Sequence, residues 1–436
     1  MTPAARVAAA IAVLDDIAAR RRPAADALKD WGLSHRFAGS GDRAAIAGLV
    51  YDTLRRRRSS AYVMGEDSAR AVVIGMLARE RGLDVAAIAA LFSGERFAPP
   101  PLAEAERARL AQGPLDGALA DAPPPVQGDY PDWLDPHLAR VFGERRAEEA
   151  AALARRAPLD LRVNTLKSAP EAALASLAHL GARAAPWSPV GLRIDLGPAA
   201  RNPAIQAEPA FIKGAVEVQD EGSQLAALLA GARPGATVID LCAGAGGKTL
   251  ALAALMGGRG RLVATDLDKR RLAPIHARLS RSGAHNVEVR TPKAFDDTAL
   301  LDDLAGRADL VLIDAPCTGT GTWRRNPDAK WRMRPGALEQ RRKDQAAVLD
   351  RAAPLVRPGG RIAYVTCSVL MEENGDQVAA FLARHPGFAA AEPDLAALGG
   401  TAEAFRAAVL HPGAGLMMTP LRTATDGFYV CLLERT

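Results

Sequence analysis

Apolar residues along the first hundred positions recur with the period of an α-helix. Ala-rich amphipathic stretches occupy residues 4–20, 42–58, 68–81 and 84–92, and Gly and Ser residues separate them. Apolar side chains three and four residues apart lie on one face of a helix, and that face needs a partner to bury it. The pattern therefore predicts an all-helical domain over residues 1–98.

The pattern changes twice in the middle of the chain. Proline clusters at 99–101 and 123–125 bracket a low-complexity segment, so we expect a linker over residues 99–128 with at most one short helix. Residues 129–218 then mix helical and alternating periods, which predicts a small α+β domain. Its expected elements are helices near 132–156 and 169–181 and strands near 159–164, 192–195 and 211–218.

Short apolar runs alternate with helical stretches over residues 219–436. The expected strands are 237–241, 261–265, 287–290, 310–313 and 361–366, and the clearest helix is 337–356. Strands that alternate with helices of this length form a doubly wound parallel sheet, so we predict an α/β Rossmann-like domain here. Extended stretches at 415–420 and 427–434 predict an antiparallel pair at the edge of the sheet.

Composition limits the function without naming it. The 436 residues carry a net charge of +5, and 49% of them are hydrophobic, which permits a polyanionic partner and a large core. No apolar run has the length of a membrane span, and no basic segment precedes the apolar stretch near the start, so we expect neither a membrane partner nor a signal peptide. The four cysteines lack the paired spacing of zinc sites and disulfides. We therefore expect a cytoplasmic monomer with free thiols and no metal.

The sharpest local feature is Val238–Thr249, where a strand leads into a Gly-rich turn and then a helix. Glycines let the backbone pass close to a ligand, and a helix start offers N–H groups without helical partners. About 20 residues later the next strand ends in Asp266, and an acid at that place can bond both ribose hydroxyls of an adenosine cofactor. Together these features predict an adenosine-type cofactor beside the turn.

Three ligands and a purely structural role compete for this turn. A dinucleotide site usually has G-x-G-x-x-G, and the residues from Gly244 to Lys248 break that spacing. A P-loop needs G-x-x-x-x-G-K-[ST]. Gly247, Lys248 and Thr249 supply its end, but Cys242 stands where its first glycine belongs. S-adenosylmethionine has no phosphate and needs only a close approach of the backbone, and a tight turn without any ligand is the remaining interpretation.

Two more strands end in chemically active residues. The fourth expected strand runs into Asp314 and Cys317, and the fifth runs into Cys367. Ligands of a doubly wound sheet bind outside the carboxyl ends of its strands. These residues should therefore share one rim with the Gly-rich turn and Asp266.

A thiol pair and a carboxylate beside an adenosine cofactor suit one class of reaction. The C5 carbon of cytosine is a poor nucleophile, and a thiolate that adds to C6 turns the ring into an enamine able to attack a methyl group. A free cysteine, with a pKa of about 8.5, supplies a few per cent of thiolate at neutral pH. An acid near N3 stabilises the adduct, and a base then removes the C5 proton. Packing as a small apolar residue is the alternative for any cysteine, and it is the better prediction for Cys242 and Cys431.

Cations and two tryptophans alternate in residues 322–334, just past the first of these thiols. Arg and Lys side chains hold phosphates, and Trp stacks on bases. We therefore expect RNA contacts from Arg324, Arg325, Lys330 and Trp331. The alternative is an exposed basic loop whose tryptophans pack on the core.

The chain resembles the RsmB/Sun (Fmu) family of RNA cytosine-C5 methyltransferases. The matching motifs follow in order over nearly all of residues 219–436, and the two-cysteine pair is specific to RNA enzymes of this type. They are Asp240–Thr249, Asp314–Cys317 with Gly319 and Gly321, Arg324–Trp331, Thr366–Leu370 with Glu373 and Asn374, and Thr425–Phe428. The middle domain is similar through Leu161–Thr165 and Val218–Gly222, and the helical start resembles the family's NusB-like RNA-binding domain.

The resemblance implies a role for each site residue. Cys367 would be the nucleophile, Cys317 would assist release of the product, and Asp314 would lie in both the cofactor site and the base site. Spacing leaves open which thiol attacks, so that assignment comes from the family. S-adenosylmethionine would bind at Cys242, Ala243, Gly244, Ala245, Gly246, Gly247 and Lys248, together with Asp266 and Asp314.

Two positions depart from the family's pattern. The family usually has Pro where this chain has Ala245, so the turn should be slightly looser. The family often places an acid after the third strand to contact the adenine amino group, and this chain reads Arg290-Thr-Pro-Lys-Ala294 there. We expect the adenine contact from the backbone or from Asp296 or Asp297, unless it is absent.

The predicted function is S-adenosylmethionine-dependent methylation of cytosine C5 in RNA. Small-subunit (16S) ribosomal RNA is the expected substrate, and transfer RNA is the alternative. An NTPase that uses Gly247, Lys248 and Thr249 is a second class of function. An inert RNA-binding assembly factor is a third, against which the intact thiol pair argues.

Overall fold

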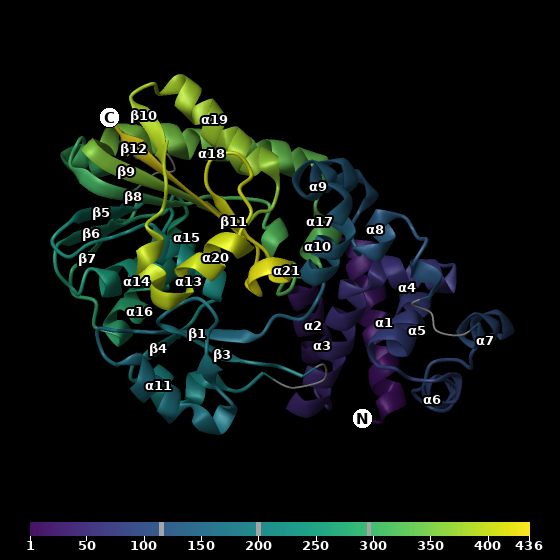
Figure 1. Cartoon of the computed structure of the whole chain (residues 1–436). Helices are drawn as coiled ribbons and strands as arrows, with labels where there is room; N and C mark the ends of the chain where they lie inside the picture. Colours follow the sequence, from purple (N-terminus) through teal and green to yellow (C-terminus); the bar gives the residue numbers. More distant parts are fainter. Residues whose placement is uncertain (113–116, 198–201, 294–297) are drawn as a thin grey trace. The chain divides into compact units, whose positions relative to one another are not determined.

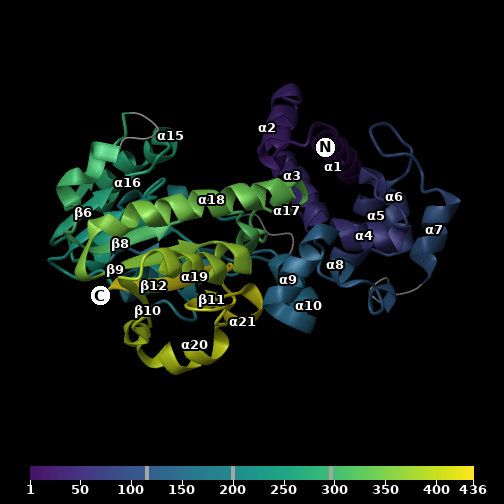
Figure 2. The same cartoon turned by 90° about the horizontal axis from the view of Figure 1, so that it is seen from above.

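The computed structural model describes residues 1–112, 117–197, 202–293 and 298–436. These residues form two compact units, coloured along the sequence in Figures 1 and 2. The first unit comprises Met1–Arg156 and Thr322–Arg334, and the second comprises Ala157–Gly321 and Pro335–Thr436.

The first unit is helical, as the N-terminal pattern predicts. Its opening helix begins at Pro3, a residue that suits the first helical position, and the Thr2 side chain accepts a hydrogen bond from the Ala5 N–H at 3.1 Å. Small Ala and branched Val and Ile side chains fill the core between the helices. The α-helices are α1 (Pro3–Arg20), α2 (Ala24–Ser34), α3 (Ser40–Arg55), α4 (Arg57–Met64), α5 (Ala69–Glu80), α6 (Val85–Leu91), α7 (Glu104–Ala111), α8 (Pro124–Gln127), α9 (Asp135–Phe142), α10 (Arg146–Leu153) and α17 (Ala329–Arg332).

Residues 99–128 hold two α-helices, so the prediction of a linker with at most one short helix is wrong. Helix α7 forms because Glu106 reaches back and accepts a hydrogen bond from the Ala103 N–H at 2.8 Å. Helix α8 starts at Pro124, since proline suits a helix N-terminus. The compact units also divide at Arg156 rather than at the predicted boundary of 128.

The second unit contains a four-stranded antiparallel sheet in the order β2-β3-β1-β4. The strand predicted over 211–218 is shorter than expected, because Pro209 starts a helical turn and Gly214, at φ +74°, reverses the chain before β4. The elements of this part are β1 (Leu159–Val163), α11 (Pro170–Ser176), β2 (Arg183–Ala184), β3 (Gly191–Ile194), α12 (Pro209–Ile212) and β4 (Val216–Val218).

An eight-stranded sheet forms the rest of the second unit, with the path β10-β12-β9-β8-β5-β6-β7 and with β11 paired to β12. The five strands from β9 to β7 along this path are parallel, which confirms the doubly wound Rossmann-like fold. The strands are β5 (Thr237–Asp240), β6 (Arg261–Ala264), β7 (Val287–Val289), β8 (Ala308–Asp314), β9 (Val356–Thr366), β10 (Phe388–Ala391), β11 (Leu416–Met418) and β12 (Phe428–Arg435).

Helices cover both faces of the large sheet (Figure 1). One face carries α13 (Glu221–Leu229), α14 (Gly247–Leu255) and α16 (Ile275–Ser282), and the other carries α18 (Pro335–Ala352) and α19 (Gly375–Arg384). Three shorter helices are α15 (Lys269–Leu272), α20 (Ala402–Ala408) and α21 (Pro420–Thr423). The strand order reverses between β5 and β8, and ligands of such sheets bind beyond the carboxyl ends of the strands at that point. Within the described ranges, every helix is too short or too polar to traverse a lipid bilayer.

The last strand lies within the antiparallel edge of the sheet, between two other strands. β12 pairs with β9 on one side and with β10 on the other, antiparallel to both. The predicted antiparallel pair of β11 and β12 does form. The same edge also carries β10, which was not predicted because its alanines show little of the apolar alternation that marks a strand.

Candidate functional site

The Gly-rich turn follows β5 and starts α14. Gly244 has a φ of +50° and Gly246 a φ of +85°, both in the region that favours glycine. A Cβ atom at Gly246 would lie 2.5 Å from Cγ1 of Ile275 on α16, so the turn passes directly over that helix. The N–H of Gly246 donates to the Ala243 carbonyl at 2.8 Å and closes the turn. The predicted cofactor segment is therefore a tight, glycine-dependent turn at the carboxyl end of β5.

Asp266, just after β6, holds this turn through its carboxylate. Its Oδ2 accepts a hydrogen bond from the Gly244 N–H and its Oδ1 accepts one from the Asp268 N–H, both at 2.9 Å. Asp266 is only 4% exposed. Each carboxylate oxygen can accept two hydrogen bonds, so both oxygens keep capacity for a ribose hydroxyl. The residues present fit an adenosine cofactor.

Asp240 is a buried acid at the end of β5. Its Oδ2 accepts a hydrogen bond from the Thr249 hydroxyl at 2.6 Å, and its Oδ1 has no hydrogen-bond partner among the described residues. Burial raises the pKa of Asp240 to about 7. No separate role was predicted for this carboxyl, although its place at the end of the strand before the turn was a signal that could have singled it out.

Lys248 forms an ion pair with a carboxylate and does not point into an open phosphate-binding site. Its Nζ lies 2.7 Å from Oδ2 of Asp314, and the lysine side chain is 7% exposed. The ammonium also lies over the Phe428 ring, 5.1 Å from its centroid. The pair links the Gly-rich turn to the end of β8 and thereby brings two predicted site residues together. A P-loop lysine would have to give up this pair to reach a phosphate.

Cys317 and Cys367 meet beyond the ends of β8 and β9, with their sulfur atoms 3.2 Å apart. Both residues are intermediate in exposure, whereas Cys431 is buried within β12. The contact with the Cys367 sulfur, together with burial, raises the pKa of Cys317, so Cys317 keeps its proton. A protonated Cys317 can donate a hydrogen bond to the Cys367 sulfur.

A buried carboxylate, Glu373, braces the loop that carries the first thiol. Thr318 donates to it twice, from its N–H to Oε1 at 2.8 Å and from its hydroxyl to Oε2. Gln345 on α18 donates from Nε2 to the same Oε1 at 3.0 Å and to the Pro316 carbonyl at 2.9 Å. Neither Glu373 nor Gln345 was predicted as a site residue. The position of Glu373 in a motif just past the second thiol was the available signal.

A second set of hydrogen bonds fixes the loop after β9. The Thr366 hydroxyl donates to Oδ1 of Asn374 at 2.6 Å, and Nδ2 of Asn374 donates to the Ser368 carbonyl at 2.9 Å. The hydroxyl oxygens of Thr320 and Ser368 lie 2.9 Å apart. These bonds tie the loops of the two thiols to each other.

Two glycines pack backbone against backbone beside the thiols. The Gly321 N–H donates to the Cys367 carbonyl at 2.9 Å, and the Gly427 N–H donates to the Gly321 carbonyl at 2.8 Å. A Cβ atom at Gly321 would fall on the backbone of Gly427, far inside van der Waals contact. The motif around Gly427 therefore belongs to the site through a close backbone approach.

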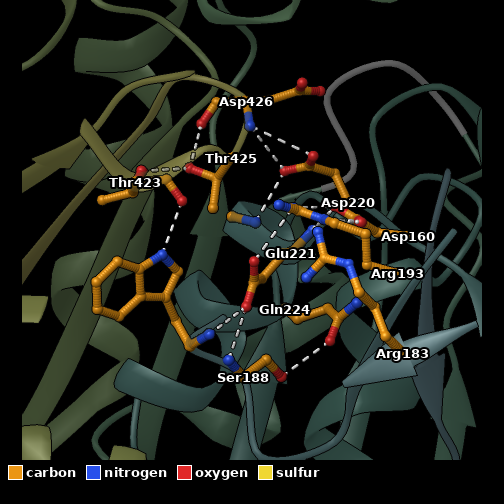
Figure 3. A network of polar contacts seen from close by, with 12 residues as sticks. Asp160, Arg183, Ser188, Arg193, Asp220, Glu221, Gln224, Thr423, Thr425 and Asp426 are labelled. Atoms are coloured by element: carbon orange, nitrogen blue, oxygen red, sulfur yellow. Dashed lines mark hydrogen bonds and ion pairs between the residues drawn. The ribbon is translucent and has the colours of Figure 1, made fainter. Parts of the chain in front are cut away.

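Buried ion pairs join the small sheet to the start of α13 (Figure 3). Arg193 on β3 donates to both carboxylate oxygens of Asp160 on β1, at 2.7 and 2.9 Å, and to Oε2 of Glu221 at 3.2 Å. Oε1 of Glu221 accepts from the N–H groups of Trp187 at 2.6 Å and Ser188 at 2.8 Å. Burial raises the pKa of Glu221 to about 7. The network fixes the small sheet against the eight-stranded sheet.

The same network reaches the segment before β12, as Figure 3 shows. Oδ1 of Asp220 accepts from the Gly222 N–H at 2.8 Å, and the Asp426 N–H lies 3.3 Å from both Asp220 oxygens. Nε1 of Trp187 donates to the Thr423 carbonyl at 2.7 Å. The small sheet is thus connected to the residues that precede the glycine contact beside the thiols.

Most of the residues predicted to bind RNA pack inside the first unit. Lys330 is fully buried, and its Nζ donates to the Arg55 carbonyl at 3.1 Å. Burial lowers the pKa of Lys330 to about 7. Nε1 of Trp331 donates to the Leu54 carbonyl at 2.7 Å. This burial contradicts an RNA contact by Lys330, because its ammonium has no exposed surface. The indole N–H of Trp331 is used in a hydrogen bond within the first unit.

The two arginines of this segment differ in exposure. Arg324 is 5% exposed, and its carbonyl accepts a hydrogen bond from Arg55 at 3.0 Å, so it too is a packing residue. Arg325 is intermediate in exposure, and its RNA contact stays a prediction. The packing alternative for the tryptophans describes this segment better than the RNA interpretation does.

The expected adenine contact lies at the limit of the described residues. Arg290 is paired with Glu288 at 2.7 Å and with Asp303 at 2.9 Å. Asp296, Asp297 and the end of the Arg290-Thr-Pro-Lys-Ala294 stretch lie outside the described residues. The source of the adenine contact therefore stays a prediction.

Most of the chain matches known methyltransferases. Residues 227–434 match the family described as 16S rRNA methyltransferase RsmB/F, and residues 130–199 match the ferredoxin-like domain of RsmF/B-like methyltransferases. The chain is 35% identical over 307 residues to ribosomal RNA small subunit methyltransferase B of Sodalis glossinidius, covering 69% of this chain and 64% of the relative. It is 34% identical over 312 residues to the protein of the same name in Pseudomonas putida, covering 71% and 67%. The chain thus spans less than two thirds of the Sodalis glossinidius relative's own length.

Solved structures share the fold. The structure titled "Crystal Structure of PH0851" matches with a TM-score of 0.69 and 25% identity, over 100% of this chain and 99% of that one. A methyltransferase homolog protein from Pyrococcus horikoshii matches with a TM-score of 0.57 and 24% identity, over 72% of this chain and 98% of that one. The second likeness supports the architecture alone.

Proposed function

Because this chain belongs to the RsmB/F family of methyltransferases, we propose that it methylates C5 of a cytosine in small-subunit ribosomal RNA through a covalent bond to Cys367. S-adenosylmethionine is the cofactor of this family, in agreement with the prediction from the sequence. The names of the curated relatives support the substrate class. The observation that carries the chemistry is the 3.2 Å contact between the sulfurs of Cys317 and Cys367.

When bound, S-adenosylmethionine supplies an electrophilic methyl group. The turn from Cys242 to Lys248 would hold it, and Asp266 would bond its ribose, because this carboxylate keeps free acceptor capacity beside the turn. Lys248 holds Asp314 at the end of β8. Asp314 thereby stands between the cofactor turn and the thiols along the rim of the sheet.

Cys367 is the attacking thiol in this scheme. Its sulfur forms a bond to C6 of the cytosine, and the electron pair of the C5–C6 double bond becomes available at C5. C5 then forms a bond to the methyl carbon as the bond between that carbon and the cofactor's sulfur breaks. Cys317 supports the attack because it keeps its own proton and can donate a hydrogen bond to the Cys367 sulfur. Asp314 is the residue proposed to lie beside N3 of the base and to stabilise the adduct.

Release of the product returns the site to its starting state. A base removes the proton from C5, the C5–C6 double bond forms again, and the bond between C6 and the Cys367 sulfur breaks. A hydrogen bond from Cys317 to the departing sulfur makes it a better leaving group. Cys317 thus has its main role after methyl transfer, while Cys367 is needed before it.

Two measurements test the function. Bisulfite mapping of cellular RNA with and without the protein should reveal one small-subunit ribosomal cytosine that loses 5-methylcytosine. Incubation of that RNA with S-adenosylmethionine labelled in its methyl group should give incorporation by the wild type and none by Cys367→Ala. Normal incorporation by Cys367→Ala would overturn the mechanism, and a change confined to transfer RNA would overturn the substrate.

A further inference from the structure

An arginine of α16 reaches the cofactor turn from outside the Gly-rich motif. Nη1 of Arg278 donates to the Ala245 carbonyl at 2.8 Å. Ala245 is exposed and stands between the two glycines with positive φ. The neighbouring Ala243 N–H is anchored to the Thr265 carbonyl at 2.9 Å. The guanidinium therefore holds the outer side of a turn whose inner side is held by the sheet.

The small sheet holds the other end of the same guanidinium. Nη2 of Arg278 lies 3.0 Å from Oε2 of Glu217 on β4, and Arg281 pairs with Oε1 of the same carboxylate. The Glu217 side chain is only 3% exposed. A buried carboxylate is costly without cations close by, so both arginines are held beside it. Glu217 therefore fixes where the Arg278 guanidinium can lie.

A second contact follows the same route from the small sheet to the turn. Gln219, just after β4, accepts a hydrogen bond from the buried Arg162 at 2.6 Å. Nε2 of Gln219 lies 3.7 Å from the place that a Cβ atom on Gly247 would occupy. The small sheet thus reaches the cofactor turn near Gly247 through Gln219, and at Ala245 only through Arg278.

We propose that Arg278 is a positioning residue that connects the small sheet to the cofactor turn and fixes the shape of the turn, with Glu217 as its anchor. The affinity for S-adenosylmethionine then depends on two residues that belong to no cofactor motif and touch no reacting atom. The identity of the ligand rests on the proposed methyltransferase function. The bridge itself rests on the hydrogen bond and the ion pair of Arg278.

Arg278→Gln in the full-length protein removes the guanidinium and tests the bridge. Amide hydrogen exchange of residues 243–248, measured without ligand, should rise by about fivefold, because the outer anchor of the turn is gone. The dissociation constant for S-adenosylmethionine, measured by calorimetry, should rise by about fivefold to tenfold. The kcat at saturating cofactor should stay within about twofold, since the chemistry is untouched. If Arg278→Gln folds poorly, Arg278→Lys takes its place in the test. This variant keeps a cation beside Glu217, and its dissociation constant for S-adenosylmethionine should also rise.

Two further variants separate positioning from general loosening of α16. Arg281→Gln also removes a cation from Glu217 but leaves the contact with Ala245, so exchange at 243–248 and cofactor affinity should stay within about twofold of wild type. Ala245→Pro, added to Arg278→Gln, should restore much of the lost affinity. The φ of Ala245 is not positive, its N–H has no hydrogen-bond partner among the described residues, and proline stiffens the turn.

The outcomes distinguish the bridge from the proposed function. Unchanged exchange and unchanged affinity in Arg278→Gln, with normal binding by the wild type, would overturn the bridge and leave the function standing. Equal effects of Arg278→Gln and Arg281→Gln would also overturn it. Failure of the wild type to bind S-adenosylmethionine would overturn the function, while exchange in the free protein would still decide the bridge.

Discussion

Removal of the Glu373 side chain tests how firmly the thiol loops are braced. Glu373→Ala deletes the acceptor of three hydrogen bonds, two from Thr318 and one from Gln345. Each buried donor that loses its partner costs about 1–3 kcal/mol. Water can reach Thr318, which is intermediate in exposure, and Gln345 keeps its bond to the Pro316 carbonyl. The free energy of unfolding should therefore fall by about 2–4 kcal/mol rather than by the full sum.

Urea unfolding and thiol alkylation measure this effect. Glu373→Gln keeps one oxygen as an acceptor for the Thr318 N–H, so its loss should be about 1 kcal/mol. Glu339→Ala, on the exposed part of α18, should change stability by less than about 0.5 kcal/mol. Alkylation of Cys317 by iodoacetamide should become severalfold faster in Glu373→Ala, because its loop is freed. A loss below about 0.5 kcal/mol in Glu373→Ala, together with unchanged alkylation, would refute the reasoning.

Three further changes test other parts of the structure. Gly321→Ala places a methyl group on the Gly427 backbone, so thermal denaturation should show a loss of about 2 kcal/mol or more; an unchanged midpoint would contradict the close approach. Asp240→Asn removes a carboxyl whose pKa burial raises from 3.8 to about 7. Because the pKa is raised in the folded state, the free energy of unfolding of the wild type falls as pH rises through this window. Urea unfolding should therefore show the stability of Asp240→Asn increasing relative to the wild type from pH 4 to 7 and keeping this advantage above pH 7. A stability difference that is independent of pH would contradict the raised pKa. Lys330→Met removes a buried ammonium. Only a cation that contacts phosphate releases counterions, so the salt dependence of RNA affinity in filter-binding titrations should not change. If the slope of log affinity against log salt falls by about one, Lys330 does contact RNA.

The sheet and its rim could be predicted from the sequence because their signals are local. Buried parallel strands read as short apolar runs, and the topology places all their carboxyl ends on one side. The ends of the expected strands alone therefore place Cys317, Cys367 and Asp314 at one edge of the sheet. The structure then adds the 3.2 Å contact between the sulfurs and the pair of Lys248 with Asp314.

Long-range packing could not be read from the chain. Lys330 and Trp331 look the same in a sequence whether they meet a phosphate or a backbone carbonyl, and here both donate to carbonyls at the end of α3. The acids Glu373 and Glu217 depend on partners 55 and 61 residues away. Their roles arise from tertiary contacts and leave no periodic signal along the chain.

The proposed covalent step through Cys367 can be tested directly by trapping the RNA adduct. Cys317→Ala, incubated with the substrate RNA and S-adenosylmethionine, should accumulate a protein–RNA complex that survives denaturing electrophoresis, because release of Cys367 is slowed. The double variant Cys317→Ala, Cys367→Ala should form none. A stable adduct in Cys367→Ala alone, or none in Cys317→Ala while the wild type methylates the RNA, would contradict the assignment of Cys367 as nucleophile and Cys317 as its partner in release.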